Sequence, residues 1–357
     1  MTSSTDPIST VSQRLESFAS DRRAEVADLG AEAADFVDRA LATVAGGKRL
    51  RARFLTAGHA AAGASAVRTD IAGVAASLEI FHAAALVHDD LVDNSDTRRG
   101  RPAAHRALEE GHRGSEWQGD ADAFGRAAAI LLGDLLIAWS DDLLEDAIDG
   151  HPYASDVRRQ YATMRRDVTV GQYLDVAEEA AWATAPDTEH AARALRVASY
   201  KSARYSVQQP LLIGAALGGA TPPQREALAD FGHAVGLAFQ LRDDVLGVFG
   251  DAAVTGKPSG DDLREGKRTV LIAYAREAMD DAGRAELDEA LGDRTLDEAT
   301  IARLQKVIED SGAVRRLESE IDRLSTAADA ALENAPIGEP EIATLREIAD
   351  AAIRRSA

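Results

Sequence analysis

The segment HDDLVDNSDTRRGRPAAH, residues 88–105, has acidic side chains at a spacing that suits a metal ion. Asp89 and Asp93 are four residues apart, so on a helix they would lie on one face, about 6 Å apart along the axis. Two carboxylates on one face repel each other unless a cation lies between them. Mg²⁺ fits this place because it prefers oxygen ligands, keeps several waters and also accepts phosphate oxygens. Asp90 would point away from this face and could act on the metal through water.

An arginine cluster follows these carboxylates directly and consists of Arg98, Arg99 and Arg101. Guanidinium groups bind phosphates through paired hydrogen bonds, so carboxylates followed by arginines are typical of a site for a metal-bound polyphosphate. The acidic pattern alone would equally suit a solvated helix end before a charged loop. The arginines that follow favour the binding site.

A second acidic pair lies in FQLRDDVLGVFGD, residues 239–251, inside an apolar helical pattern. Gln240, Asp243 and Asp244 are three and four residues apart, so all three can face the same way. Buried carboxylates are unfavourable unless they are paired or bound to metal, which favours a functional role. A buried salt bridge with Arg242, or with an arginine elsewhere, is the alternative.

Two basic segments that contain glycine could bind anions. In GGKRLRARF, residues 46–54, a Gly-Gly pair precedes three cations within one helical turn, namely Lys48, Arg49 and Arg51. The free N–H groups at a helix start would add to their positive charge. In TGKPSGDDLREGKRT, residues 255–269, Lys257 and Lys267 lie in a glycine-rich loop that could close over a phosphate. Each segment alone would equally suit a solvated surface, as would the shorter signals Gly171-Gln172-x-x-Asp175 and Lys201-Ser202.

The elements that must position these residues are predicted to be helices. Alanine is abundant, proline is scarce (10 residues) and aromatic residues make up only 5%, a composition that favours helix. No alternating strand pattern is present, and the predicted helices cover residues 11–44, 49–62, 70–93, 124–148, 156–180, 191–218 and 222–248. The 191–218 segment is either one helix broken near Tyr200 or two helices. We expect an all-α protein, with residues 1–10 as a flexible tail and residues 11–357 as a single large helical bundle.

The overall charge and the absence of cysteine exclude several classes of function. A net charge of −20 repels nucleic acid and anionic membrane surfaces, so neither is expected as a partner. With no cysteine, the chain has no disulfide, thiolate metal site or cysteine nucleophile. The start MTSSTDPIST lacks the basic and apolar parts of a signal peptide, and no apolar run is expected to reach the length that spans a bilayer. We therefore expect a cytoplasmic protein without an integral membrane segment.

The order of the motifs resembles that of the trans-isoprenyl (polyprenyl) diphosphate synthase family. A basic turn, DDxxD with RRGRP, GQxLD, a lysine, FQxxDD and GKxxGDDxxxGK follow one another between about Gly46 and Thr269. The resemblance implies an isoprenoid synthase fold with a deep central cavity, and a homodimer. It also implies a Mg²⁺-dependent reaction in which an allylic C–O bond ionises, isopentenyl diphosphate attacks the carbocation, and a proton is lost.

By motif position, the resemblance also implies a role for each site residue. Asp89 and Asp93 would hold two Mg²⁺ ions and Asp243 the third, three in each active site. The residues that bind isopentenyl diphosphate would be Lys48, Arg51, His82 and Arg99. The residues that bind the allylic diphosphate would be Arg98, Lys201, Gln240, Lys257 and Lys267. Asp89, Asp93, Lys201 and Asp243 would take part in catalysis. His82 lies two turns before Asp89 on the same face, although a histidine on an apolar helix is more often a core residue.

The second acidic motif departs from the family pattern. Gly247 stands where many members carry a third aspartate, and Asp251 comes four residues later. We expect metal binding in this motif to depend on Asp243, with Asp244 and Asp251 acting through water.

The residues just before Asp89 bear on product length. In the family that this sequence resembles, bulky residues four and five positions before the first aspartate form the floor of the product cavity and stop elongation early. Here those positions are Ala85 and Ala84. A helix rises about 1.5 Å per residue, so the floor would lie at least one turn deeper, near Phe81 and Ile80. We expect geranylgeranyl diphosphate as the product, with longer chains as the alternative.

Two other functions use related sites. A class I terpene cyclase also has an aspartate-rich metal site in an all-α fold, but it needs aromatic residues to steer cations and lacks the basic cluster for isopentenyl diphosphate. A non-catalytic subunit of a heteromeric synthase would have eroded aspartate motifs, whereas the motif at Asp89 is intact.

Overall fold

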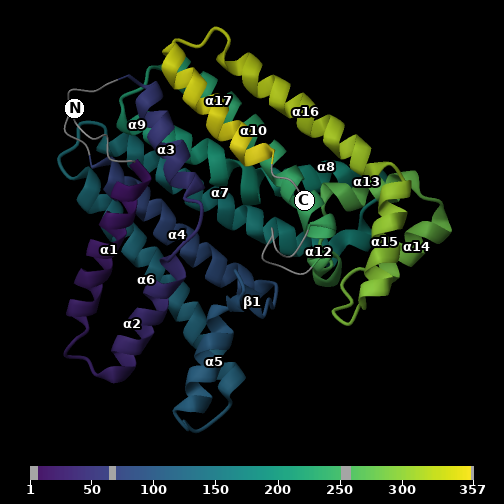
Figure 1. Ribbon diagram of the computed structural model, residues 1–357, viewed down its shortest axis with the longest axis horizontal. Helices are drawn as coiled ribbons and strands as arrows, with labels where there is room; N and C mark the ends of the chain where they lie inside the picture. Colours follow the sequence, from purple (N-terminus) through teal and green to yellow (C-terminus); the bar gives the residue numbers. More distant parts are fainter. Residues whose placement is uncertain (1–6, 64–69, 251–258, 355–357) are drawn as a thin grey trace. The chain divides into compact units, whose positions relative to one another are not determined.

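The computed structural model describes residues 7–63, 70–250 and 259–354, and helices make up nearly all regular structure in these ranges (Figure 1). The contacts divide the chain into two compact units, residues 7–56 with 70–154 and residues 57–63 with 155–354. The all-α prediction is confirmed. The single-domain boundary at residues 11–357 stays a prediction.

The first unit contains the helices α1 Pro7–Glu25, α2 Ala31–Val44, α3 Leu50–Ala61, α4 Ile71–Val92, α5 Ala104–Gly114 and α6 Ala121–Ile148. The end of α3 groups with the second unit. The helix expected over 11–44 is two helices, because Gly30 adopts a φ of 98° before α2. The expected tail is also too long: α1 begins at Pro7, where proline presets a helical φ and has no N–H to leave unbonded. Residues 1–6 lie outside the described ranges.

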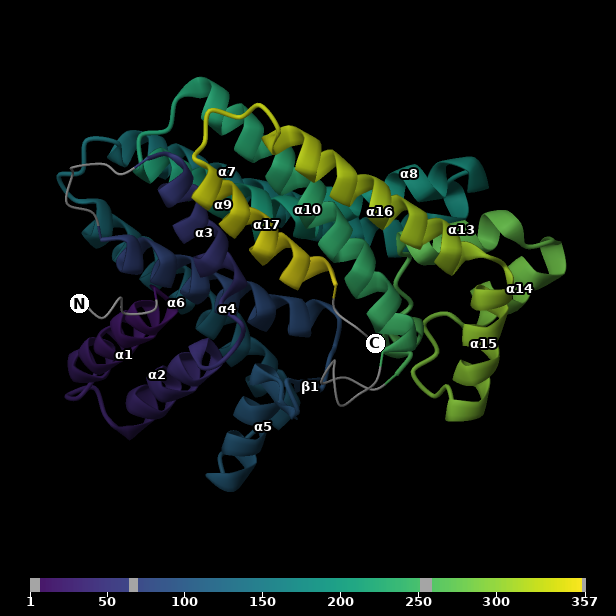
Figure 2. The same ribbon diagram turned by 45° about the horizontal axis from the view of Figure 1, so that its top comes forward.

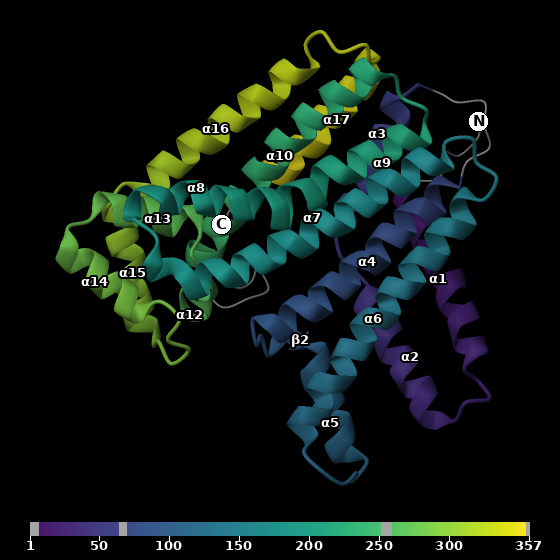
Figure 3. The ribbon, with the colours of Figure 1, turned by 180° about the vertical axis from the view of Figure 1, so that it is seen from behind.

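Helix α4 is the central helix of the first unit and carries the first acidic motif at its end. The Asp70 side chain caps its start by accepting a hydrogen bond from Gly73 N at 2.8 Å. Helix α6 runs beside α4 (Figure 3), and the Ser140 hydroxyl donates to Ser77 O at 2.6 Å in their buried contact. Near the acidic end of α4, Gly133 of α6 leaves room for the His88 side chain. A Cβ on Gly133 would lie 2.1 Å from His88 Nε2. Close packing against α6 thus fixes the helix that presents Asp89.

Helix α4 is also long and apolar enough, by composition, to cross a membrane, with a mean hydropathy of 1.5 in its most apolar window. The expectation that no apolar run reaches this length is therefore wrong. Because 67% of that window is buried inside the structure, α4 has the character of a core helix.

The RRGRP segment forms a small hairpin of two strands, β1 Thr97–Arg98 and β2 Arg101–Pro102, paired antiparallel. The sequence analysis expected no strand, because two-residue strands are too short to show alternation. Arg99 and Gly100 form the turn with φ values of 54° and 70°. Two successive positive φ values are typical of the tight turn of a two-residue hairpin loop. Arg98 lies in strand β1, whereas Arg99 lies in the turn.

The second unit contains the remaining helices: α7 Ala154–Ala181, η1 Trp182–Thr184, α8 Asp187–Val197, η2 Ala198–Gln208, α9 Gln209–Leu217, α10 Pro222–Phe249, α12 Asp261–Glu265, α13 Val270–Ala278, α14 Asp281–Ala290, α15 Glu298–Asp310, α16 Ala313–Leu332 and α17 Glu339–Ile353. Helix α10 packs against η2 and α16, and Figure 2 shows α16 beside α10. Its Arg242 donates to Glu318 of α16 at 2.7 Å. The alternative that Arg242 neutralises the adjacent aspartates therefore finds no support in these contacts.

The predicted break near Tyr200 is a π-helix, η2, between α8 and α9. Wide turns of this kind are rare and often occur at functional sites. Gly171 of α7 allows a close approach, since a Cβ there would lie 2.3 Å from Lys201 N. The Gly171-Gln172 signal in the sequence thus marks the contact between α7 and the segment that carries Lys201.

Candidate active site

The first acidic motif is held by an arginine from the hairpin. Asp90 is 2% exposed, and Arg98 Nε donates to its Oδ1 at 2.8 Å. Arg98 Nη2 also donates to Asp89 Oδ2 at 3.3 Å. Asp90, expected to act on the metal only through water, is therefore the buried anchor of Arg98. The same guanidinium that was assigned to the allylic diphosphate orients Asp89 in this structure.

Asp93 follows directly as the residue that ends α4. Its backbone N–H donates to Asp89 O at 2.8 Å, so the two residues remain one helical turn apart, as predicted. Within the described ranges, no group of three or more His, Asp or Glu side chains forms a ready-made metal site. Mg²⁺ does not require one, because it is commonly held by one or two carboxylates together with waters and substrate phosphates. Asp89 and Asp93 supply that type of donor set.

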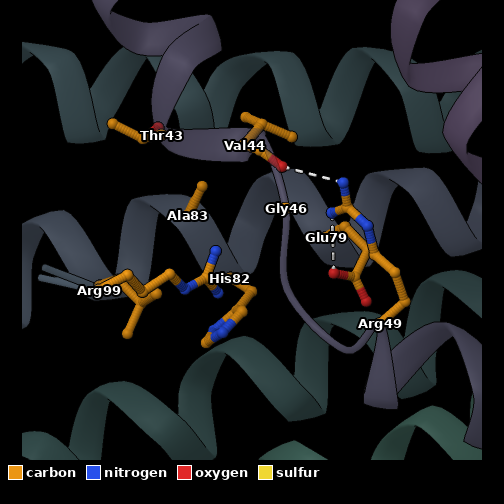
Figure 4. Close-up of a pocket in the computed structure, with 9 residues that line it drawn as sticks. Thr43, Val44, Gly46, Arg49, Glu79, His82, Ala83 and Arg99 are labelled. Atoms are coloured by element: carbon orange, nitrogen blue, oxygen red, sulfur yellow. Dashed lines mark hydrogen bonds and ion pairs between the residues drawn. The ribbon is translucent and has the colours of Figure 1, made fainter. Parts of the chain in front are cut away.

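A basic pocket lies beside α4 in the first unit (Figure 4). Its lining residues are Thr43, Val44, Gly46, Arg49, Glu79, His82, Ala83, Leu86 and Arg99. The pocket thus brings together two residues predicted to bind isopentenyl diphosphate, His82 and Arg99. It also includes Arg49, which the sequence analysis named only as one of three cations of a possible anion site, and Glu79, to which it gave no role.

The glycine pair 46–47 forms the seat of Arg99. Gly46 and Gly47 have φ values of 77° and 88°. Arg99 Nη1 donates to Ala45 O at 3.2 Å, and a Cβ on Gly47 would lie 3.0 Å from Arg99 Nη2. A side chain at position 47 would therefore be strained and would crowd the guanidinium. The Gly-Gly pair in the sequence marks this seat.

His82 is surrounded by positive charge. Its pKa is lowered well below the usual value, first by burial and then by Arg51, Arg99, Arg98 and Arg49. The imidazole is thus neutral at pH 7 and can donate one hydrogen bond without adding a charge. Arg51 is 9% exposed and close enough to lower the pKa of His82, but it does not line the pocket, and its role in binding the anion stays a prediction. Lys48 is exposed and is not among the pocket's lining residues.

The second acidic motif lies on α10, and its two adjacent carboxyl groups differ in burial. Asp243 is partly exposed, whereas Asp244 is 4% exposed and accepts a hydrogen bond from Gln240 Nε2 at 2.8 Å. The pKa of Asp244 is raised to about 8, first by burial and then by the nearby Asp262 and Asp243, against the opposing effects of Gln240 and Lys267. Asp244 is therefore mainly protonated at pH 7, which leaves Asp243 as the candidate metal ligand of this motif. Its role as a ligand stays a prediction.

Asp262 of α12 occupies the space beside Gly247. A Cβ on Gly247 would lie 2.0 Å from Asp262 Oδ2, so the glycine is what admits this carboxylate. The aspartate missing from the motif is thus replaced in space by one that lies fifteen residues later. Asp251, the expected helper, lies outside the described residues. Asp262 was visible in the sequence only as part of the GDD segment.

Lys201 and Lys267 are each held by a carboxylate. Lys201 Nζ lies 2.5 Å from Asp175 Oδ2, which explains the aspartate of the GQxLD segment. Lys267 Nζ lies 2.9 Å from Glu265 Oε2 at the end of α12. Both cations have side chains about one-fifth exposed, at 20% and 21%. Lys257 lies outside the described residues.

The three residues expected to set chain length lie on α4, within the helix predicted over residues 70–93. Phe81 is 6% and Ala84 is 1% exposed, and Ala85 is partly exposed. The two alanines leave little side-chain volume in the turn before Asp89.

Comparisons with known proteins agree on one family. Residues 36–308 match the polyprenyl synthetase family model. The chain is 32% identical to a geranylfarnesyl diphosphate synthase of Aeropyrum pernix, over 77% of this chain and 79% of that protein. It is 31% identical to a geranylgeranyl diphosphate synthase of Mycobacterium tuberculosis, over 87% and 81%. A (2E,6E)-farnesyl diphosphate synthase of the same species is also 31% identical, over 87% and 80%.

The fold agrees with a solved structure as well. A geranylgeranyl pyrophosphate synthase of Corynebacterium glutamicum, crystallised with isoprenyl diphosphate and magnesium, is 37% identical to this chain. The alignment covers 99% of this chain and 100% of that one, with a TM-score of 0.92. The chain therefore belongs to the polyprenyl synthetase family of magnesium-dependent prenyltransferases, the trans-prenyl diphosphate synthases.

Proposed function

We propose that this enzyme condenses isopentenyl diphosphate with an allylic diphosphate and that geranylgeranyl diphosphate is its main product. The observation that carries the product length is the pair Ala84 and Ala85 in the turn of α4 before Asp89. Related proteins named as farnesyl, geranylgeranyl and geranylfarnesyl diphosphate synthases make products of three lengths, so the relatives alone do not select one. The similarity to the geranylfarnesyl synthase favours a longer product as the second candidate.

The basic pocket in the first unit is proposed to bind the diphosphate of isopentenyl diphosphate. Arg99 is seated on the glycine turn, Arg51 adds charge, and neutral His82 donates a hydrogen bond. Charge-assisted hydrogen bonds of this kind are stronger than neutral ones and give the site its preference for a dianionic group. Lys48 keeps its proposed role as an exposed cation at the edge of this turn.

Asp89, Asp93 and Asp243 are proposed as the ligands of Mg²⁺, three ions in each active site. When bound, Mg²⁺ neutralises the diphosphate charge and stabilises the departing pyrophosphate. Arg98 holds Asp89 in place through Asp90, and Asp175 holds Lys201. Lys201, Lys257, Lys267, Gln240 and Arg98 remain proposed contacts of the allylic diphosphate. Because their partners already fix them, Asp89 and Lys201 would act without reorganising when the C–O bond breaks.

Ala84→Phe should shorten the main product, because a phenyl group in the turn before Asp89 would block the growing chain. The product should shift from C20 towards C15 when isopentenyl diphosphate and a C10 primer are supplied. Radiolabelled products sized by chromatography would show this shift. Ala84 is 1% exposed, so overpacking could also destabilise the fold by about 1–3 kcal/mol. Ala85→Phe, at a partly exposed position of the same turn, is the second variant, and an unchanged product from both folded variants would contradict the floor argument.

A homodimer and a cytoplasmic location are also proposed. In the first unit, Ile130 and Leu131 of α6 are 51% and 61% exposed, an apolar surface that a second copy could cover. Light scattering of the purified protein should give twice the chain mass of 37.8 kDa. A monomer at micromolar concentration would contradict the dimer.

A further inference from the structure

We propose that Glu79 is a positioning residue for isopentenyl diphosphate, because it fixes the turn on which Arg99 is seated. This inference rests on the function proposed above for the basic pocket. Glu79 lies on α4, one turn before His82, and is 5% exposed. A buried carboxylate in a pocket for an anion would weaken binding if its charge were not neutralised.

Both carboxylate oxygens of Glu79 bind the segment that follows the glycine pair. Arg49 Nη1 donates to Oε2 at 3.1 Å (Figure 4). The backbone N–H of Ala52 donates to Oε1 at 3.3 Å. The first contact neutralises the charge of Glu79. The second satisfies a backbone N–H in the first turn of α3, which has no partner within its own helix. Glu79 thus joins α4 to the start of α3.

Arg49 transmits this constraint to the turn. It has a φ of 51°, a backbone conformation that a residue other than glycine adopts only when its surroundings hold it there. Its Nη2 donates to Val44 O at 3.0 Å, across the base of the turn. The next carbonyl, Ala45 O, accepts the hydrogen bond from Arg99. Glu79 therefore acts through Arg49 on the backbone that seats Arg99.

Glu79 also determines which arginines remain available for the anion. Arg49 is occupied by Glu79 and Val44 O, and its side chain is only 11% exposed. Within the described residues, Arg99 donates a hydrogen bond to one backbone carbonyl, Ala45 O, and keeps donors for a ligand. Without Glu79, Arg49 would be a buried cation beside other arginines, and the turn would move to reduce this repulsion. The affinity for isopentenyl diphosphate would fall as a result.

Glu79→Gln tests this role, since it keeps the shape and removes the charge. We expect KM for isopentenyl diphosphate to rise about tenfold, while kcat and KM for the allylic diphosphate change by less than about threefold. Glu79→Asp, which keeps the charge, should recover part of the lost affinity. If KM for isopentenyl diphosphate stays at the wild-type value, or both KM values rise equally, the inference is wrong.

Glu109→Gln is the matched control. Glu109 lies on α5 in the same unit, is 6% exposed and binds Arg106 at 2.8 Å and Arg113 at 2.5 Å, outside the pocket. It should lower Tm without changing either KM. Calorimetric titration of isopentenyl diphosphate without metal or allylic substrate measures binding without turnover. Weaker binding of isopentenyl diphosphate by Glu79→Gln than by wild type would support the positioning role. If the wild-type protein binds isopentenyl diphosphate but elongates nothing, that result would contradict only the proposed function.

Discussion

Asp89→Asn should lower kcat by about a thousandfold or more, with little change in the fold. The substitution keeps the size of the side chain and removes the charge that a metal ligand needs. A loss of this size corresponds to about 4 kcal/mol of transition-state stabilisation, within the range that metal ions supply. Arg98 would still be held by the buried Asp90, so the hairpin should stay in place. Steady-state rates with saturating Mg²⁺ and both substrates would measure the effect.

Asp146→Asn is the control for this prediction. Asp146 is an exposed aspartate of α6 in the same unit, so the same chemical change there should leave kcat within about twofold of wild type. Circular dichroism and Tm should be close to wild type for both variants. A folded Asp89→Asn enzyme with more than a tenth of wild-type kcat would show that this aspartate is not a metal ligand.

Arg99→Gln should raise KM for isopentenyl diphosphate by about thirtyfold, with a much smaller effect on KM for the allylic diphosphate. The change removes a charge-assisted hydrogen bond, which contributes about 1.5–3 kcal/mol. Glutamine is chosen because position 99 has a φ of 54°, so both residues bear a similar backbone strain and the comparison isolates the guanidinium.

Arg101→Gln provides the matched comparison for Arg99. Arg101 is exposed in the same hairpin, paired with Arg98 across the strands, and it does not line the basic pocket. Its substitution should leave both KM values within about twofold. Equal effects of the two substitutions would mean that only the general charge of the hairpin matters, and the assignment of Arg99 to isopentenyl diphosphate would fail.

The long helices could be predicted from the sequence because apolar spacing and alanine content act over many residues. The helices predicted over residues 70–93 and 222–248 agree with α4, Ile71–Val92, and α10, Pro222–Phe249. The hairpin at Thr97–Pro102 was missed because its two-residue strands carry no periodic signal. The division of 11–44 into two helices depended on the backbone of Gly30, which composition does not reveal.

The site was predictable where a motif keeps its residues close in the chain. Asp89, Arg99 and His82 were named as candidates from such motifs, and the structure brings His82 and Arg99 into one pocket. The contacts of Glu79 with Arg49 and of Asp262 with Gly247 could not be predicted from motifs, because each joins residues from separate segments of the chain. The burial that separates protonated Asp244 from Asp243 likewise depends on packing around α10, which a motif does not show.

Elongation of farnesyl diphosphate tests the central claim most directly. The purified protein would be incubated with Mg²⁺, labelled isopentenyl diphosphate and farnesyl diphosphate, and the products would be hydrolysed and sized. We predict a C20 product that requires Mg²⁺ and disappears when the metal is chelated. The absence of any elongated product from the folded wild-type protein would contradict the account.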